Sequence, residues 1–408
     1  TFKISSIADG NDTIDGDTAS ASANDTEIDT VDYSGITDST YHLEADLTAG
    51  KVYVKDNATT PNTLITTTVR NIENITGTAG NDVFVGDSSA NVFDGQGGSD
   101  IVDYSTGSKV EANLSSSDVV YNSKTYLANK AVITSTNTDT LYNIENIKGS
   151  SYGDVIIGNS DKNTFYGNAG DDYLDGGAND YHLEGGDGND ILKGGSGNDY
   201  LDGGAGIDTV DYSDRTVNLT VNIADGTHTI VTGEIDTFKD VEGIIGGSGN
   251  DVLTGNSGAN SLVGGAGNDI LDGAGTSSAN AGEYDYLDGG AGTDFVSYKN
   301  ATSAVTINLG LRYDSSTSTD HSYNDADGAV KDYQDGGAAG RIQITGVENL
   351  EGGTVDDIIY GNSDKNTLIG GAGNDTFRGG AGNDVIIGGT ILTVDANGDI
   401  ATQSNETG

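Results

Sequence analysis

Large apolar residues recur at every ninth position through long stretches of the chain, and each stands between two smaller or polar neighbours. In the longest stretch, residues 149–213, these positions are Ile156, Phe165, Leu174, Leu183, Leu192, Leu201 and Val210. A three-residue strand points its middle side chain to one face and its neighbours to the other. The glycine-rich segments between these triplets are typical of turns. The pattern therefore predicts short strands that alternate with tight turns.

The apolar period is part of a nonapeptide, G-G-x-G-x-D-x-U-x, where U is a large apolar residue. Gly185 begins GGDGNDILK, Gly194 begins GGSGNDYLD and Gly203 begins GGAGIDTVD. The same frame occurs in four phased blocks, which begin at Gly77, Gly149, Gly246 and Gly352. Repeats of this length are a signature of solenoids.

Two nonapeptides are expected to close one flattened coil of 18 residues. Successive coils then stack about 4.8 Å apart and pair as parallel strands. The sequence predicts an all-β fold, an elongated parallel β-roll or β-solenoid with intervening β-strand and hairpin segments. One large apolar residue in nine leaves a thin core, so the coil needs a further source of stability.

Segments of a second kind separate the blocks. Each begins near D-T-V-D-Y-S, alternates apolar and polar residues as in Val217–Ile223 and Val305–Leu309, and ends near N-I-E-N. We interpret them as β excursions that widen the solenoid or lie against it. The predicted organisation is a partial repeat at 1–34, excursions at 35–76, 106–148, 214–245 and 299–351, repeat blocks at 77–105, 149–213, 246–298 (with a loop insertion) and 352–389, and a solvated coil at 390–408.

The net charge of −46 restricts the partners. Such a chain repels nucleic acid and anionic membranes, and its self-repulsion opposes a compact state. Dense carboxylate suits a hard cation, although a chain this acidic can also stay disordered. No apolar run is long enough for a membrane span, and there is no cysteine for a disulfide or thiolate site. Because the sequence lacks methionine, we expect it to be a processed or partial piece.

The aspartate of the nonapeptide is the candidate metal ligand. Aspartates 18 residues apart fall on the same edge of successive coils, where two carboxylates repel unless a divalent cation lies between them. An all-oxygen shell that includes turn carbonyls suits Ca²⁺. The alternative is that these aspartates stand in ordinary solvated turns, where aspartate is common, but such turns do not require a spacing of 18 residues. The predicted calcium ligands are Asp82, Asp100, Asp154, Asp172, Asp190, Asp199, Asp208, Asp251, Asp269, Asp294, Asp357, Asp375 and Asp384.

Some repeats depart from this motif. The second repeat of each block carries asparagine at the ligand position, at Asn91, Asn163, Asn260 and Asn366, and the repeat from Gly176 carries Tyr181. In the longest block one edge is therefore rich in aspartate, and the other reads Asn163, Tyr181, Asp199. We predict that the first edge binds calcium and that the second binds it weakly.

These blocks resemble the RTX (repeats-in-toxin) family, the hemolysin-type calcium-binding repeats. The resemblance implies a parallel β-roll with several Ca²⁺ ions between its turns. It also implies a secreted bacterial protein that is exported unfolded by type I secretion and folds outside the cell.

Two functions from different classes remain open. The chain lacks H-E-x-x-H and G-x-S-x-G, and its four histidines are scattered, so we expect no enzymatic activity. The favoured function is a structural protein of the bacterial cell surface, such as a surface layer (S-layer), fibre or adhesin stalk, which self-assembles or contacts other surface components. The alternative is a noncatalytic calcium module of a secreted protease, lipase or polysaccharide-modifying enzyme.

Overall fold

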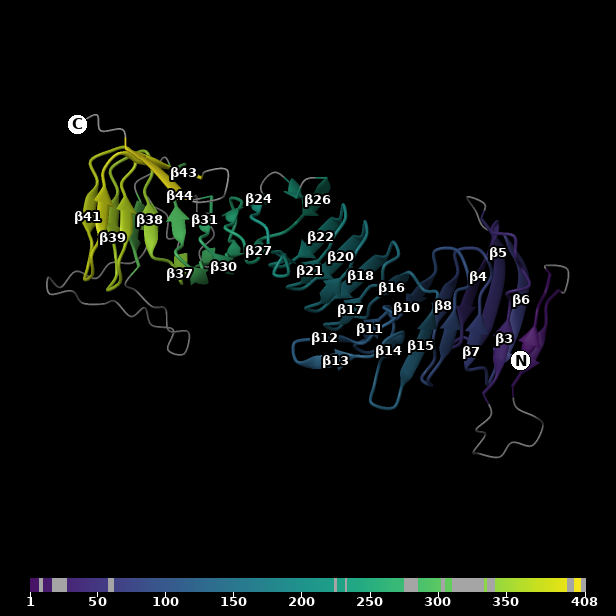
Figure 1. Cartoon of the computed structure of the whole chain (residues 1–408). Helices are drawn as coiled ribbons and strands as arrows, with labels where there is room; N and C mark the ends of the chain where they lie inside the picture. Colours follow the sequence, from purple (N-terminus) through teal and green to yellow (C-terminus); the bar gives the residue numbers. More distant parts are fainter. Residues whose placement is uncertain are drawn as a thin grey trace. The chain divides into compact units, whose positions relative to one another are not determined.

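The computed structural model describes residues 1–6, 10–16, 28–57, 62–223, 226–231, 233–274, 285–301, 305–309, 334–335, 342–394 and 400–404. The described residues form strands and turns without a helix (Figure 1). The chain divides into two compact units, Thr1–Gly206 and Ile207–Gly408.

Two stacks of short strands build the first unit. In spatial order, one contains β1 (Phe2–Lys3), β3 (Thr30–Asp32), β7 (Asn74–Thr76), β9 (Val92–Asp94), β15 (Thr138–Tyr142), β14 (Lys130–Val132), β11 (Glu111–Asn113), β17 (Val155–Ile157), β19 (Tyr173–Asp175) and β21 (Ile191–Lys193). The other contains β2 (Thr13–Asp15), β6 (Thr63–Arg70), β5 (Lys51–Asp56), β4 (Tyr41–Asp46), β8 (Val83–Val85), β10 (Ile101–Asp103), β16 (Asn146–Lys148), β18 (Thr164–Ala169), β20 (His182–Asp187) and β22 (Tyr200–Ala205).

The coil of 18 residues is confirmed by the strand register. In the longest block, Tyr173 pairs with Ile191 in one stack, and Thr164 pairs with His182 in the other, in parallel. Consecutive strands β17 to β22 alternate between the two stacks. The fold is thus the predicted parallel β-roll.

The core is the single file of U residues between the two stacks. Their side chains have no exposed surface at Ile156, Phe165, Leu174, Leu183, Leu192 and Leu201. Burying one such side chain contributes about 1.5–3 kcal/mol. The flanking strand residues face outward and are mostly half-buried, as the pattern predicted.

The excursions of the first unit are inserted into the stacks. Strand β11 pairs in parallel with β17, and β15 pairs in parallel with β9. Strand β14 lies between β11 and β15 and is antiparallel to both. Strands β4, β5 and β6 repeat this arrangement in the other stack, between β8 and β2. An excursion therefore adds one antiparallel strand to a parallel stack.

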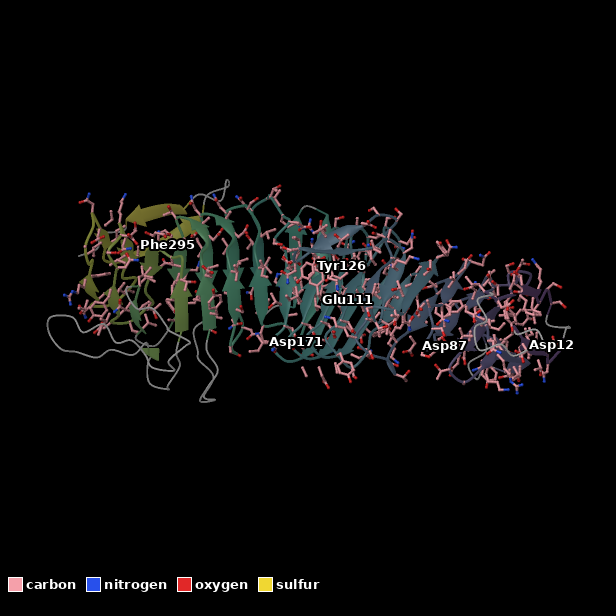
Figure 2. The ribbon with its side chains drawn as sticks, turned by 90° about the horizontal axis from the view of Figure 1, so that it is seen from below. Asp12, Asp87, Glu111, Tyr126, Asp171 and Phe295 are labelled. Atoms are coloured by element: carbon pink, nitrogen blue, oxygen red, sulfur yellow. The ribbon has the colours of Figure 1, made fainter. Side chains whose placement is uncertain are left out.

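One hairpin covers an outer face instead. Strands β12 (Val119–Tyr121) and β13 (Lys124–Tyr126) pair with each other, and Tyr121 stacks on Tyr173 at 3.6 Å between ring centroids. Tyr126 packs with Val155 and Ile157 on the outward side of the sheet, and it is labelled in Figure 2. The hairpin thereby buries outward apolar residues.

The second unit repeats this plan. One stack contains β24 (Thr220–Asn222), β28 (Val252–Thr254), β31 (Ile270–Asp272), β34 (Phe295–Ser297), β38 (Asn349–Glu351), β40 (Thr367–Ile369) and β42 (Val385–Ile387). A second stack contains β23 (Thr209–Asp211), β27 (Gly243–Ile245), β29 (Ser261–Val263), β32 (Asp285–Asp288) and β37 (Ile342–Thr345). A third contains β36 (Gln334–Asp335), β35 (Val305–Asn308), β39 (Ile358–Tyr360) and β41 (Thr376–Arg378). Strands β25 (Thr227–Val231) and β26 (Glu234–Lys239) form an antiparallel pair.

Two expectations for this unit were wrong. The tail is not a simple coil, because β43 (Thr390–Val394) and β44 (Ile400–Ser404) form an antiparallel hairpin. Its runs TILTV and IATQS have strand character and flank the turn-forming DANGD. Val217 is exposed, whereas Leu219 and Val221 are buried, so the alternating strand begins later than predicted. The loop insertion at 275–284 lies outside the described residues.

Candidate metal centre

The aspartates of the longest block form a ladder along one edge of the first unit. Asp154, Asp172 and Asp190 each precede a strand of the same stack. The Asp154 N–H donates to Asp172 Oδ1 at 2.6 Å, and the Asp172 N–H donates to Asp190 Oδ1 at 2.8 Å. Each carboxylate is therefore held against the backbone of the coil before it.

The same bond recurs in the other three blocks and on the second edge of the longest one. Asp100, Asp269 and Asp375 accept from the N–H of Asp82, Asp251 and Asp357. Asp294 accepts from Asp269, Asp199 from Tyr181, and Asp384 from Asn366. All the predicted ligands are buried except Asp375 and Asp384, which are half-buried in the last coils.

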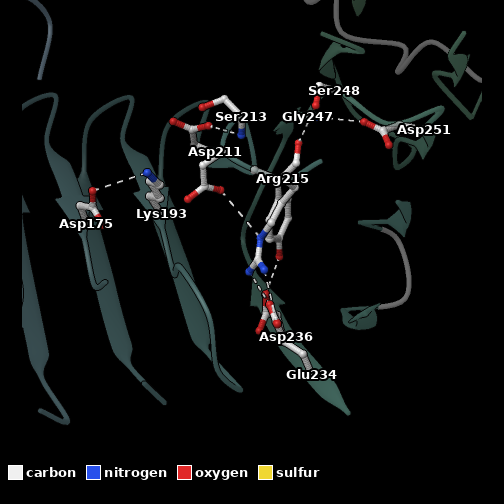
Figure 3. A network of polar contacts seen from close by, with 12 residues as sticks. Asp175, Lys193, Asp211, Ser213, Arg215, Glu234, Asp236, Gly247, Ser248 and Asp251 are labelled. Carbon is white, nitrogen blue, oxygen red and sulfur yellow. Dashed lines mark hydrogen bonds and ion pairs between the residues drawn. The ribbon is translucent and has the colours of Figure 1, made fainter. Parts of the chain in front are cut away.

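The first aspartate of a block differs from those that follow in the hydrogen bonding of its second carboxylate oxygen, Oδ2. Asp82, Asp154, Asp251 and Asp357 each accept a further N–H through Oδ2, as Figure 3 shows for Gly247 and Asp251. In the described part of the chain, Oδ2 of Asp100, Asp172, Asp269 and Asp294 is buried without a hydrogen-bond partner. A buried carboxylate oxygen without a partner is costly unless something positive reaches it.

A glycine leaves room beside this oxygen. At Gly167, a Cβ atom would lie 2.2 Å from Asp172 Oδ2 and 2.5 Å from the Gly185 carbonyl oxygen. A side chain here would collide with both oxygens, so the first glycine of the nonapeptide keeps open a space that a carboxylate and a carbonyl share. This donor set fits Ca²⁺, which prefers several hard oxygen ligands.

The electrostatics of the ladder favour a cation as well. Burial, together with the negative charges of Asp154 and Asp190, raises the pKa of Asp172 to about 8. Burial likewise raises the pKa of Asp100 to about 8 and that of Asp269 to about 7. At neutral pH these carboxyl groups are ionised in the unfolded chain, and burying them requires a proton or a cation to neutralise the charge. Without a cation they therefore oppose folding.

In calcium-free buffer, we expect β-structure to increase when the pH is lowered from about 8.5 to about 5.5. The folded-state pKa of Asp172 lies above its usual 3.8, so the folded state binds more protons than the unfolded state between these values. The stabilisation by protonation is fully present below the unfolded-state pKa and is lost as the pH rises through the folded-state pKa. Far-ultraviolet circular dichroism measures the change.

Saturating calcium should reverse the sign of this pH dependence, because the ligands must be deprotonated to bind metal. A loss of β-structure on mild acidification of the calcium-free chain would contradict the prediction.

The second edge of the longest block is built differently. Asn163 Oδ1 accepts from the Asn159 N–H, and its amide donates to Asn159 Oδ1. The amide of Asn260, at the same position of another block, donates to the carbonyl oxygens of Asn256 and Gly258 at 3.1 and 2.7 Å. At these positions an amide NH₂ group bonds to turn oxygens of the kind that a cation would bind.

Tyr181 fills its own turn. The ring is buried, and its atoms lie 2.7 Å from where a Cβ of Gly176 would stand. The hydroxyl donates to the Asn159 carbonyl oxygen at 2.6 Å and accepts from the Ala178 N–H. Of the three ligand positions Asn163, Tyr181 and Asp199, only the last carries a carboxylate. Weak calcium binding at this edge stays a prediction.

The nonapeptide pattern missed several acidic residues. Asp285 accepts from the Asn260 N–H, and Asp139 from the Asn91 N–H, each at 2.9 Å. Four glutamates, Glu73, Glu145, Glu242 and Glu348, accept from the N–H of the aspartate that opens the preceding D-T-V-D-Y-S motif or its variant. Each glutamate stands 18 residues before a repeat asparagine, so the nonapeptide frame extended backwards would have found them.

The tyrosine of the D-Y-S motif has a buried partner inside the excursion. The Tyr104 hydroxyl donates to Asp139 Oδ2 at 3.1 Å, and the Tyr212 hydroxyl donates to Asp236 Oδ2 at 2.6 Å. In Figure 3, Asp236 and Glu234 lie beside Arg215, which pairs with Glu234. These contacts attach the start of an excursion to its last strand.

No group of three or more histidine or acidic side chains comes together as a metal site within the described ranges.

The family model of the RTX calcium-binding nonapeptide repeat matches residues 72–108, 148–181, 182–210, 245–276, 283–298, 345–377 and 360–390. The chain carries RTX repeats. They bind Ca²⁺, and their number implies several ions. All the predicted aspartate ligands lie within the matched RTX ranges.

Among curated proteins, no relative matches the chain. Proteins with RTX repeats are typically secreted, and this chain is accordingly an extracellular calcium-binding repeat protein. The described residues include no helix that is long and apolar enough to cross a membrane.

Proposed function

We propose that this chain is a noncatalytic structural protein of a bacterial cell surface, which folds on binding calcium and then assembles with further copies of itself. The observation that carries the proposal is the continuity of the stacks inside each unit. Repeats and excursions contribute strands to the same sheets, so the excursions lengthen a scaffold. A protein that spans distance at a surface needs such a scaffold.

The charge of the chain gives calcium a second role. At −46, separate copies repel one another at low ionic strength. About a dozen bound ions would cancel about 24 negative charges. Calcium thus completes the coils and lowers the barrier to association.

The last coil offers a surface for association. Ile386 stands at a core position of β42, yet 49% of its surface is exposed, whereas Leu368 in the preceding coil is fully buried. Among the described strands, β42 is the outermost of its sheet, and such edge strands pair with other strands unless they are covered. End-to-end strand pairing is the mode of assembly that this coil supports.

We expect calcium to convert the purified chain into filaments or a lattice. Light scattering and electron microscopy, at millimolar calcium and in chelator, measure the change. Ile386→Lys, which places a charge on the exposed end, should abolish assembly, whereas Ile235→Lys at an equally exposed position of β26 should leave it intact. A folded chain that stays monomeric at high concentration contradicts the proposal and favours a calcium module of a secreted enzyme.

A further inference from the structure

Each excursion returns to the repeat frame through a short corner. Strand β15 leads to β16 through Asn143, Ile144 and Glu145. Asn143 is left-handed at φ 49°, as are Asn71, Asp240 and Gly346 at the other three corners, with φ between 49° and 57°. A buried Ile144 takes the place of the glycine turn. The same geometry in four unlike excursions indicates a common role.

The glutamate of each corner continues the aspartate ladder. The Asp100 N–H donates to Glu145 Oε2, and the Asp294 N–H donates to Glu348 Oε2, both at 2.8 Å. Glu73 and Glu242 accept in the same way from Asp29 and Asp208. Two aspartates of neighbouring repeats make the equivalent bond, so each glutamate occupies a ligand position outside the nonapeptide motif.

Oxygens converge beside this glutamate as they do in the repeats. Where a Cβ of Gly95 would stand, both Asp100 Oδ2 and the Asn143 carbonyl oxygen lie at 2.2 Å. Asp100 Oδ2 is buried and has no hydrogen-bond partner in the described part of the chain. At the second corner, the Gly346 carbonyl oxygen lies 2.3 Å from the corresponding position of Gly289, beside Asp294, whose Oδ2 is also buried without a partner there.

We propose that the Asp100–Glu145 and Asp294–Glu348 pairs each hold a further Ca²⁺, which joins the last coil of one block to the corner that begins the next. Two carboxylates and a carbonyl are hard ligands that suit this ion. The longer glutamate side chain reaches the ladder from a corner that is shorter than the glycine turn. This inference rests on the proposed calcium-dependent function and adds to it a metal site at the block boundaries.

Glu145→Gln and Glu348→Gln, singly and together, test the proposal. Glutamine keeps an oxygen that can accept the aspartate N–H, so the corner keeps its hydrogen bond and loses only the charge. Glu184→Gln is the matched control, because Glu184 lies on the outer face of β20 and pairs with His182. Native mass spectrometry counts the bound ions, and calcium titration calorimetry gives their affinities.

We expect each corner variant to bind one ion fewer than the parent chain, the double variant two fewer, and the control the same number. Equal ion counts and affinities in parent and corner variants would overturn the inference, because the glutamates would then act as hydrogen-bond acceptors alone. The parent chain separates this failure from that of the proposed function. If the parent binds several ions, only the corner sites fail, and if it binds none, both proposals fail.

Discussion

Without calcium at neutral pH, the chain should be largely unfolded, and millimolar calcium should restore its β-structure. The cause is the buried ladder, in which Asp100 and Asp172 have pKa values raised to about 8 by burial and by neighbouring carboxylates. One file of apolar side chains provides little stabilisation against this cost. Circular dichroism in chelator and in calcium is the measurement.

The size of the effect follows from mass action. An ion that binds only the folded state stabilises it by about 2.7 kcal/mol when the free ion is at 100 times its dissociation constant. The summed stabilisation from about six such ions exceeds the usual net stability of a domain, about 5–15 kcal/mol. The melting temperature should therefore rise continuously with calcium concentration. Equal β-content and equal melting temperatures in chelator and in calcium would refute this expectation, and magnesium serves as the ionic control.

The second large effect is expected from Asp172→Asn. Asp172 stands between Asp154 and Asp190, so it belongs to two adjacent candidate sites. We expect the variant to lose roughly 3–5 kcal/mol of calcium-dependent stabilisation, from two ions at about 2.7 kcal/mol each. In chelator it should be more stable than the parent chain, because an amide removes a buried charge and can donate to turn oxygens as Asn260 does.

Chemical denaturation in calcium and in chelator separates these two effects. Asp187→Asn is the matched control, because it removes the same charge from an exposed residue at the end of β20. It should change the free energy of unfolding by no more than about 0.5 kcal/mol, both in calcium and in chelator. Asn163→Ala should cost about 1 kcal/mol in both conditions, since it removes only neutral hydrogen bonds. If Asn163→Ala reduces calcium binding as much as Asp172→Asn, the assignment of the two edges is wrong.

The repeat blocks could be predicted from sequence because one local rule fixes them. A core residue every nine positions and an aspartate before it determine strand, turn and coil together, and the register of Tyr173 with Ile191 follows directly. The different build of the second edge could also be anticipated, because Asn163 and Tyr181 stand at its ligand positions in the sequence. The structure adds that Tyr181 fills its turn with its own ring.

The excursions could not be placed in this way. Their strands pair with partners distant in sequence, as β11 does with β17 across 44 residues, and alternation alone does not distinguish insertion into a sheet from packing on its face. The corner glutamates were missed because N-I-E-N lacks the glycines by which a repeat is recognised, although Glu145 keeps its phase. Asp285 was missed because the loop insertion shifts the spacing from 18 to 25 residues.

The antiparallel strand inserted by each excursion of the first unit has a mechanical consequence. Within a block, each coil contacts only its neighbours, so under tension coils should peel off singly, each releasing 18 residues, or roughly 60 Å of extended chain. In the first unit β14 runs against this direction and is bonded on both sides, to β11 and β15. When unfolding along the stack reaches β14, the hydrogen bonds on both of its sides must break together. The excursions of the first unit would therefore act as arrest points that limit how far a pulled chain unravels.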